Sequence, residues 1–404
     1  MPTAARHGAP KADLQDFGPE TSDLGLETVN SPDVRFMRRA LALARRAEGL
    51  TRPNPPVGAV LIAPDGETVL GEGWHHRAGC PHAEVEAFLD AERRGADVRG
   101  ATLFVTLEPC STTGRTPPCT TRILASGVRR VVVGSVDANP RHAGAGLCLL
   151  RDAGVEVTEG VLRRETDTLL APFFHWIRTG RPFVTLKMAS SLDGAIADAH
   201  GTSQWISCAT SRAAVQRLRR AADAVLVGAG TALADDPSLL CRLPGAAKRD
   251  GIRRIVVDAS GRLPATLRVF TDGHAAQTVV ATTRQCPDAV AAAWRATGAT
   301  VWTLPQAAGE RGVDLPALLV HAGEAGLMHI LCEGGATLAG ALIRAGLVDE
   351  LRLYLAPIAL CGRTASVFGD ASIPLAEAPR FVFDRPRRSG DDWLFVGKPT
   401  ERRG

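Results

Sequence analysis

The sequence predicts an α/β protein of two domains, and three observations support this prediction. The chain has 404 residues, which is more than one ordinary domain contains. Apolar runs typical of strands alternate with runs at helical spacing in both halves of the chain. A Gly- and Pro-containing stretch at residues 179–182 separates the two regular regions. We therefore expect a loosely ordered extension over residues 1–32, one domain over 33–178 and a second over 183–400.

The first domain is expected to be a three-layer sandwich with helices on both faces of one sheet. An Asp65-Gly66 pair between two apolar runs indicates a hairpin turn, and Pro109 ends a third strand. The predicted elements follow in order: a helix with Phe36, Met37, Ala40, Leu41 and Ala44 on one face, strands at 57–62 and 68–72, a helix beginning near His82, a strand at 102–107, a helix at 120–126, a strand at 131–133, a helix after Gly146 and a closing helix at 162–176.

One histidine and two cysteines in this domain have the pattern of a catalytic zinc site. His82 is followed by Glu84, and Cys110 is separated from Cys119 by eight residues. Three protein ligands leave the fourth position of a tetrahedral zinc ion open to water, which is typical of catalytic rather than structural zinc. Glu84 is placed to move protons between this water and a leaving group. The pattern predicts zinc-dependent deamination of a nucleobase.

The expected local structure around the ligands favours a bound metal. His82 follows a turn at residues 79–81 and opens a helix, and Cys119 follows Pro117-Pro118 and opens another. The positive end of a helix dipole stabilises a thiolate. A single His-x-Glu or a single cysteine has little meaning alone, because both are common in ordinary cores. Their combination is specific, and Cys80 is expected to be structural rather than a fourth ligand.

The second domain is also expected to be α/β, because apolar strand-like runs recur between helical runs. We predict strands at 184–187, 224–227, 254–257, 278–281, 300–303, 329–331 and 351–355, with helices at 211–221 and 336–345. Glycine-rich turns follow two of these strands, at 228–231 and at 333–340. Such turns before a helix can bind phosphate through backbone amides, although they are also common structural joints. Neither matches the G-x-G-x-x-G fingerprint, so a Rossmann dehydrogenase is not supported.

Composition bounds the partners and the compartment. The net charge of +4 is mild and spread out, and no basic stripe interleaved with aromatic residues predicts nucleic-acid binding. No apolar stretch approaches the ~20 residues of a membrane span, and the first thirty residues lack the apolar core of a signal peptide. Nine cysteines form an odd count without framework spacing. We expect a cytoplasmic protein acting on small anionic molecules.

Several motifs in a fixed order carry a family resemblance. They are Pro53-Asn54-Pro55-Pro56-Val57-Gly58, Gly73-Trp74-His75, Pro81-His82-Ala83-Glu84, Glu108-Pro109-Cys110, Gly114-Arg115-Thr116-Pro117-Pro118-Cys119, Asn139-Pro140, Lys187 to Gly194, Gly201 to Ile206, Asp235-Asp236-Pro237 and Glu333-Gly334-Gly335. With them the chain resembles the bifunctional riboflavin biosynthesis proteins over residues 33–397. These fuse a diaminohydroxyphosphoribosylaminopyrimidine deaminase to a 5-amino-6-(5-phosphoribosylamino)uracil reductase.

The resemblance implies a cytidine-deaminase-like domain followed by a dihydrofolate-reductase-like domain, in a homo-oligomer acting on phosphoribosylated pyrimidines. One Zn²⁺ per chain would be held by His82, Cys110 and Cys119, with Glu84 as proton donor and acceptor and with Asn54 in support. NADPH would contact Ala189, Trp205, Thr231, Asp235, Ser260 and the turn formed by Gly335, Ala336, Thr337, Leu338, Ala339, Gly340 and Ala341. The substrate of the reductase would be held by Ser203, Arg219, Leu239, Arg242 and Glu333, with Lys187 supporting the polar cluster at the reacting carbon.

One departure and two alternatives accompany this hypothesis. Thr112-Thr113 stands where the family usually has a histidine after Cys-Ser, so a substrate contact or the turnover rate can differ. The first alternative is a nucleic-acid or nucleoside deaminase with an accessory non-catalytic domain, but that class mostly shows Cys-x-x-Cys spacing. The second is a non-catalytic binding protein with decayed sites. The presence of His82, Glu84, Lys187 and Asp235 argues against decay.

Overall fold

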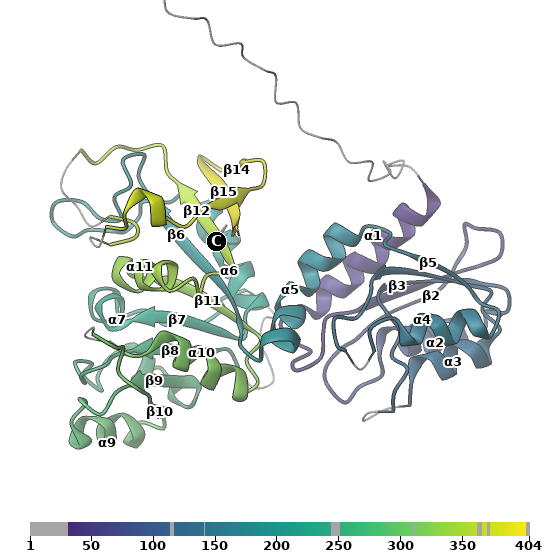
Figure 1. The fold of residues 1–404 in the computed structure, drawn as a ribbon, viewed down its shortest axis with the longest axis horizontal. Helices are drawn as coiled ribbons and strands as arrows, with labels where there is room; N and C mark the ends of the chain where they lie inside the picture. The colour runs from purple at the N-terminus through teal and green to yellow at the C-terminus, as the bar shows by residue number, and fades with distance from the viewer. Residues whose placement is uncertain are drawn as a thin grey trace, which may run out of the picture.

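The chain folds into two α/β domains that lie side by side (Figure 1). The structure is a computed structural model, and it describes residues 31–113, 117–140, 142–243, 251–309, 312–361, 366–369 and 372–400. Almost all of the predicted N-terminal extension lies outside these residues. So do Gly114, Arg115 and Thr116 of the loop between the two cysteines.

The first domain has the expected three layers around a five-stranded sheet with the strand order β2-β1-β3-β4-β5. Strand β1 is antiparallel to β2 and β3, whereas β3, β4 and β5 are parallel to one another. The elements are α1 (Pro32–Ala44), a 3-10 turn (Arg45–Ala47), β1 (Gly58–Ile62), β2 (Val69–Trp74), α2 (Ala83–Arg93), β3 (Thr102–Leu107), α3 (Cys119–Ser126), β4 (Arg130–Ser135), α4 (Ala145–Asp152), β5 (Glu156–Glu159) and α5 (Arg163–Thr179).

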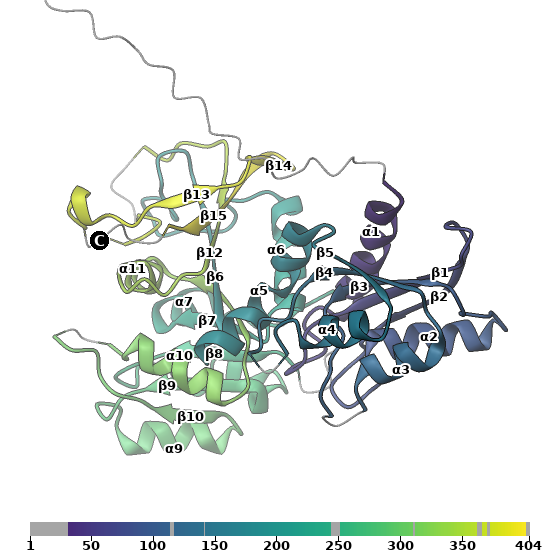
Figure 2. The same ribbon diagram turned by 45° about the vertical axis from the view of Figure 1, so that its right-hand side comes forward.

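Alternation along the strands divides the core of this domain between the two faces of the sheet. Val60 and Phe104 pack with the apolar side of α1, whereas Leu61 and Leu103 pack with α2, α3 and α4 on the opposite face. Figure 2 shows α1 on one side of the sheet and α2 and α3 on the other. Ser31 caps α1 by accepting a hydrogen bond from the Val34 amide at 3.2 Å.

Two glycines in β2 let α2 lie close against the sheet. A Cβ on Gly73 would lie 2.4 Å from the carbonyl oxygen of Ala83, and one on Gly71 would lie 2.2 Å from that of Ala87. A side chain at either position would therefore push the helix away from the strand. The close approach sets the position of the first turn of α2, which carries Glu84 and follows His82.

The second domain is built on a ten-stranded sheet, larger than the sequence predicted. Its elements are β6 (Phe183–Ser190), α6 (Ala209–Ala221), β7 (Ala224–Gly228), α7 (Ala229–Asp235), β8 (Arg253–Val257), α8 (Arg268–Thr271), a 3-10 turn (Ala275–Gln277), β9 (Thr278–Thr282), α9 (Asp288–Ala296), β10 (Thr300–Thr303), α10 (Leu315–Glu324), β11 (His329–Gly334), α11 (Ala336–Arg344), β12 (Glu350–Leu355), a 3-10 turn (Leu375–Glu377), β13 (Phe381–Phe383), β14 (Arg387–Ser389) and β15 (Asp392–Pro399).

The order of the strands determines where a ligand can bind in this domain. The strands run β10-β9-β8-β7-β11-β6-β12-β15-β13, and β14 pairs with β15. All pairs from β10 to β12 are parallel, and β15 is antiparallel to β12. Strand β11 is inserted between β6 and β7, so the carboxyl ends of these three strands are neighbours. In open α/β sheets, ligands bind at such a switch in strand order.

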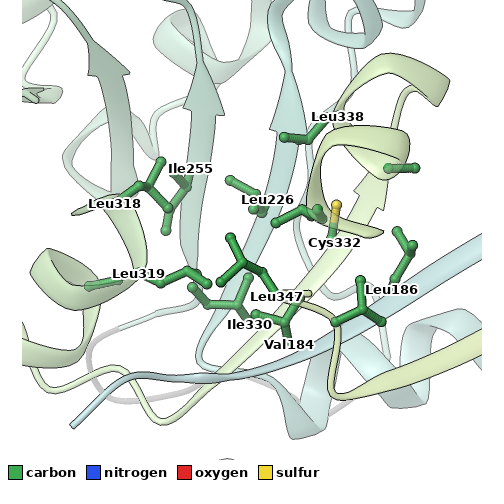
Figure 3. Packing of buried hydrophobic residues seen from close by; sticks show 14 of the residues in the cluster. Val184, Leu186, Leu226, Ile255, Leu318, Leu319, Ile330, Cys332, Leu338 and Leu347 are labelled. Atoms are coloured by element: carbon green, nitrogen blue, oxygen red, sulfur yellow. The ribbon is translucent and has the colours of Figure 1, made fainter. Parts of the chain in front are cut away.

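One core of the second domain lies between the sheet and the helices α10 and α11 (Figure 3). Leu186, Leu226 and Ile330 come from the central strands and are fully buried. Leu318 and Leu319 of α10 and Leu338 of α11 pack over them. Nearly continuous apolar strands are expected where a parallel sheet is covered on both faces.

The two domains contact each other directly. Met328 of the second domain packs into the core cluster of the first. The indole Nε1 of Trp176, on α5, donates a hydrogen bond to the carbonyl oxygen of Gly323 at 3.3 Å. Helix α5 continues to Thr179, so the predicted linker is reduced to residues 180–182. The short connection and these contacts hold α5 against the second domain.

Candidate active sites

The structure brings the three predicted zinc ligands together. His82 is the N-cap of α2, Cys119 is the first residue of α3, and Cys110 lies in the loop after β3. Their ligand atoms lie within 4.8 Å of one another. Two ligands thus stand at helix starts, as the sequence predicted. Elsewhere in the described ranges, no other group of three or more His, Cys, Asp or Glu side chains is arranged to hold a metal ion.

The distances between these atoms fit a tetrahedral zinc ion. His82 Nδ1 lies 3.5 Å from Cys110 Sγ and 3.3 Å from Cys119 Sγ. Zinc–sulfur and zinc–nitrogen bonds at tetrahedral angles separate such atoms by about 3.6 Å. The backbone amide of Cys119 also donates a hydrogen bond to Cys110 Sγ at 3.3 Å. An amide directed at this sulfur stabilises it as a thiolate.

The two cysteines behave as one acid pair. A hydrogen bond from Cys119, together with the imidazole of His82, lowers the pKa of Cys110 to about 4. The same hydrogen bond and burial raise the pKa of Cys119. The pair therefore shares one proton at neutral pH, and binding of a divalent ion displaces this proton.

Glu84 stands beside the cluster without belonging to it. It lies in the first turn of α2 and only 3% of its surface is exposed. Burial raises the pKa of its carboxyl group to about 7, although the positive charge of His82 opposes this effect. A carboxyl group with a pKa near the working pH can both accept and donate a proton.

A pocket of about 330 Å³ opens over the cluster. It is lined by His82, Glu84 and Cys110, and by two groups to which the sequence assigned no role: Asp137 and His142 from the loop after β4, and Phe173, Trp176 and Ile177 of α5. These residues are far from the zinc motif along the chain, and no local signal marks them. The apolar wall from α5 and the polar residues opposite suit a flat, polar ring.

Glu108 holds the loop that carries Asp137 and Asn139. Its carboxylate accepts hydrogen bonds from the amides of Asp137, Gly144 and Gly146 at 3.1, 2.9 and 3.0 Å. Glu108 is buried. The first residue of the Glu-Pro-Cys motif thus shapes the pocket wall, whereas the third offers a metal ligand.

Asn54 faces the same pocket, and His75 sets the orientation of its amide. The Nδ1 atom of His75 lies 2.9 Å from the carbonyl oxygen of Pro81, to which it donates, so its Nε2 accepts from the Asn54 amide nitrogen at 3.0 Å. Burial lowers the pKa of His75 and keeps this ring neutral. Asn54 is therefore left with its amide oxygen free to accept a hydrogen bond from a ligand.

Replacement of His75 with phenylalanine tests this arrangement. The ring shape and the edge contact with His82 would be kept, but the acceptor for the Asn54 amide would be lost. We expect zinc to be retained and the KM of deamination to rise about tenfold, the cost of one misplaced hydrogen bond. Steady-state ammonia release measures this, with Asn54→Ala as the matched variant. An unchanged KM in both variants would remove this pair from substrate binding.

The second pocket, of about 530 Å³, lies at the carboxyl ends of β6, β7 and β11. It brings together all five predicted substrate residues and five of the twelve predicted cofactor residues. Its lining includes Ser203, Arg219, Leu239, Arg242, Glu333, Lys187, Ala189, Trp205, Thr231, Asp235 and Gly335. Residues spread over nearly 150 positions of sequence thus meet at the switch in strand order.

Arg219 and Glu333 form a paired unit at the centre of this pocket. The guanidinium donates to both carboxylate oxygens of Glu333, at 2.6 and 2.9 Å, and to the carbonyl oxygen of Leu240 at 2.9 Å. Both side chains are nearly buried, with 10% and 12% exposed. These bonds use three of the five N–H donors of Arg219 and position Glu333 and the Leu240 segment, and the predicted contact of Arg219 with the substrate stays a prediction.

Lys187 lies next to this pair, within β6. Burial lowers the pKa of its ammonium group, the charge of Arg219 acts in the same direction, and Glu333 opposes both. The ammonium also lies 5.8 Å from the centre of the Tyr354 ring. A lysine with a perturbed pKa beside a carboxylate in a pocket marks a candidate functional site.

Some predicted cofactor residues lie apart from this pocket lining. Ser260 is exposed in the turn after β8, and Ala336, Thr337, Leu338, Ala339, Gly340 and Ala341 form α11. Leu338 and Ala339 pack in the core. Gly335 is the residue of this turn that lines the pocket. Its φ is 85°, and a Cβ at this position would lie 2.7 Å from Thr231 Oγ1. The contacts predicted along α11 remain a prediction.

Comparison with known proteins gives two family matches that divide the chain as the two sheets do. Residues 30–135 match the cytidine and deoxycytidylate deaminase zinc-binding region. Residues 182–395 match the RibD C-terminal domain. Across the described ranges, we find no helix that is both long and apolar enough to span a membrane.

Full-length relatives and solved structures cover both parts together. The riboflavin biosynthesis protein RibD of Escherichia coli K12 is 42% identical, over 89% of this chain and 97% of that protein. The protein of the same name from Bacillus amyloliquefaciens is 40% identical, over 91% and 96%. The crystal structure of a diaminohydroxyphosphoribosylaminopyrimidine deaminase/5-amino-6-(5-phosphoribosylamino)uracil reductase from Thermotoga maritima has a TM-score of 0.79 at 35% identity, covering 91% of this chain and 99% of that one. Acinetobacter baumannii RibD gives 0.78 at 34% identity, over 92% and 99%.

Proposed function

The chain belongs to the RibD family of riboflavin biosynthesis proteins, and from that premise we propose which of its residues carry out the two reactions. The first domain is a zinc-dependent pyrimidine deaminase and the second is a reductase that uses NADPH. The substrate is 2,5-diamino-6-(5-phosphoribosylamino)pyrimidin-4-one, and the ribosyl chain of its deaminated product is reduced to ribityl. The relatives do not favour a nucleic-acid deaminase.

We infer that His82, Cys110 and Cys119 hold the zinc and that Glu84 is the proton carrier of deamination. Bound zinc supplies a nucleophilic water by lowering its pKa. Glu84 accepts a proton from this water and returns one to the departing ammonia, a role that its raised pKa supports. Asn54 accepts a hydrogen bond from the ring, and Phe173 and Trp176 cover one side of the pocket and exclude water.

For the second reaction we propose that Glu333 and Lys187 lie at the reacting sugar carbon and that Asp235 contacts NADPH. NADPH supplies the hydride that this carbon receives. Arg219 holds the Glu333 carboxylate in place, and Lys187 provides a cation beside it. Ser203, Leu239 and Arg242 bind the rest of the substrate, while Ala189, Trp205, Thr231 and Gly335 line the cofactor part of the pocket.

We also propose three coarser properties. The deaminase domain spans residues 33–178 and the reductase domain 183–400, and the family matches over 30–135 and 182–395 fall in one domain each. The protein works in the cytoplasm, because both substrates are small and polar and its cysteines have no framework spacing. It forms a homo-oligomer, whose state can be measured by light scattering.

The proposal rests chiefly on the His82–Cys110–Cys119 cluster with Glu84 beside it, in a chain that also carries the second pocket. A coupled assay of the zinc-loaded protein tests it, with the diaminopyrimidine substrate and NADPH present and with ammonia and NADPH absorbance followed together. Ammonia release followed by NADPH oxidation is expected. NADPH oxidation that precedes ammonia release would contradict the proposed order.

Replacement of Arg242 with alanine should weaken the substrate more than the cofactor. Arg242 lines the second pocket, and the contact seen for it is its backbone amide, which donates to Gln216 Oε1 at 2.9 Å. A guanidinium contact with a phosphate is worth about 10- to 100-fold in affinity. We expect the substrate KM to rise by that factor and the NADPH KM to change less than about twofold. Arg284→Ala, an exposed arginine away from the pocket, is the control. An unchanged substrate KM would sink this assignment.

A further inference from the structure

Arg268 lines the second pocket, but neither of the reactions above uses it. It begins the short helix α8, which lies between β8 and β9 in the chain. No sequence motif marks it, because it lies in an ordinary Leu-Arg-Val-Phe run. The question is why an arginine should be held at this place.

The backbone of Arg268 is anchored to the loop that carries the substrate residues. Its amide donates to Asp236 Oδ1 at 2.6 Å. Asp236 follows the predicted cofactor residue Asp235 and adopts a left-handed conformation with φ of 39°. The side chain of Arg268 takes no part in this hydrogen bond. The bond therefore fixes the backbone and leaves the guanidinium able to contact a ligand.

A buried arginine ties the same two segments together a second time. Arg254, on β8, is fully buried and donates to the carbonyl oxygen of Ser238 at 3.1 Å, to that of Val269 at 2.8 Å and to that of His274 at 2.6 Å. It also pairs with Asp272 at 2.5 Å. Ser238 precedes Leu239 and Arg242, and Val269 follows Arg268. This buried network thereby joins the segment that leads to Arg242 with the helix that Arg268 begins.

The other cations of the pocket are already engaged. Arg219 pairs with Glu333, Lys187 lies beside that pair, and Arg212 bonds to the Ser207 carbonyl oxygen and stacks 4.6 Å from the Trp205 ring. Within the described ranges, no side chain of opposite charge pairs with the guanidinium of Arg268 or of Arg242. Both reactants of this domain carry phosphate, which such groups bind.

We propose that Arg268 is a phosphate-binding residue of the reductase pocket, contacting a phosphate monoester together with Arg242. This inference rests on the proposed reductase function. The monoester is either the 5-phosphate of the substrate or the 2′-phosphate that distinguishes NADPH from NADH. Both present a dianion that a guanidinium can bind through two oxygens.

The test uses the full chain with the variants Arg268→Gln and Arg268→Lys, and Arg262→Gln as control. Arg262 is an exposed arginine of the same lobe and lies away from the pocket. Affinities for NADPH and NADH are measured by nicotinamide fluorescence. The KM is measured for 5-amino-6-(5-phosphoribosylamino)uracil and for its dephosphorylated form. Because the backbone amide makes the anchor, these substitutions leave it in place, and thermal unfolding confirms that the variants fold.

We expect Arg268→Gln to weaken one phosphate-bearing ligand at least about tenfold, while its counterpart without the phosphate changes little. Arg268→Lys should retain part of the affinity. Loss against NADPH alone would identify the 2′-phosphate, and loss against the phosphorylated uracil alone would identify the 5-phosphate. Equal affinities of the wild type and Arg268→Gln for both phosphate-bearing ligands would overturn the assignment of Arg268 and leave the reductase intact. A wild type that binds neither ligand would overturn both this inference and the proposed reductase site.

Discussion

Glu84→Gln is expected to abolish ammonia release while the protein keeps its zinc. Glutamine has the same shape, and Glu84 lies beside the His82–Cys110–Cys119 cluster without being one of the three ligands, so the metal site should not change. The amide cannot cycle a proton between the water and the leaving group. General acid–base catalysis of this kind is worth about 10²- to 10⁴-fold in rate. Single-turnover ammonia release, with zinc content measured by atomic absorption on the same sample, checks both parts.

Two controls make this result specific. Glu86→Gln changes a carboxylate on the same helix that lies outside the pocket lining, and it should leave the rate unchanged. Glu84→Gln should still oxidise NADPH when the deaminated uracil is supplied directly, because the second pocket is separate. A variant that releases ammonia at the wild-type rate would exclude Glu84 as the proton carrier. Loss of zinc from the variant would show instead that the carboxylate supports the metal.

Arg219→Met should cause the largest loss in the second domain. Removal of the guanidinium leaves the Glu333 carboxylate nearly buried without its two donors. Breaking a buried ion pair from one side costs roughly 3–5 kcal/mol in the free energy of unfolding. We expect the unfolding transition of the reductase domain to fall markedly and NADPH oxidation to be lost, whereas ammonia release persists. Scanning calorimetry with separate assays of the two activities measures this.

The double variant Arg219→Met/Glu333→Leu separates folding from function. With both charges removed, the uncompensated carboxylate is gone and most of the stability should return, but the reduction should not. Arg217→Met, on the exposed face of the same helix, is the matched control. If the single variant unfolds like the wild type, the pair contributes no stability, and the positioning role given to Arg219 is wrong.

The zinc site could be predicted from sequence because its chemistry is local. His82 and Glu84 share one helical turn, and Cys110 and Cys119 flank one loop, so spacing alone indicates a cluster. The strands and helices around them were also predicted, usually to within a few residues, because long amphipathic or fully apolar runs have strong periodicity. The distances from His82 Nδ1 to the two cysteine sulfurs fit the tetrahedral zinc site that this pattern predicts.

Other parts of the structure could not be predicted for reasons that are equally physical. Strand β5 has the sequence Glu-Val-Thr-Glu and is mostly exposed, so it carries little apolar signal. Strands β13 and β14 have three residues each and exist only because β15 offers them an edge. Arg268 is positioned by Asp236, which is distant in the chain, and His75 is oriented by the carbonyl oxygen of Pro81. A pattern of residue types does not reveal either contact.

Helix α5 lines the pocket of the first domain and also contacts the second domain. Phe173, Trp176 and Ile177 form a wall of the deaminase pocket, yet Trp176 is hydrogen-bonded to Gly323 and the helix packs near Met328, both in the other domain. The family match to the second domain begins at residue 182. Residues beyond this point nevertheless support α5 and with it the wall of the first pocket. For enzyme engineering, a deaminase excised at that boundary would keep this wall but lose the Gly323 hydrogen bond and the Met328 packing that support it. Fusion in this chain is part of how the first active site keeps its shape.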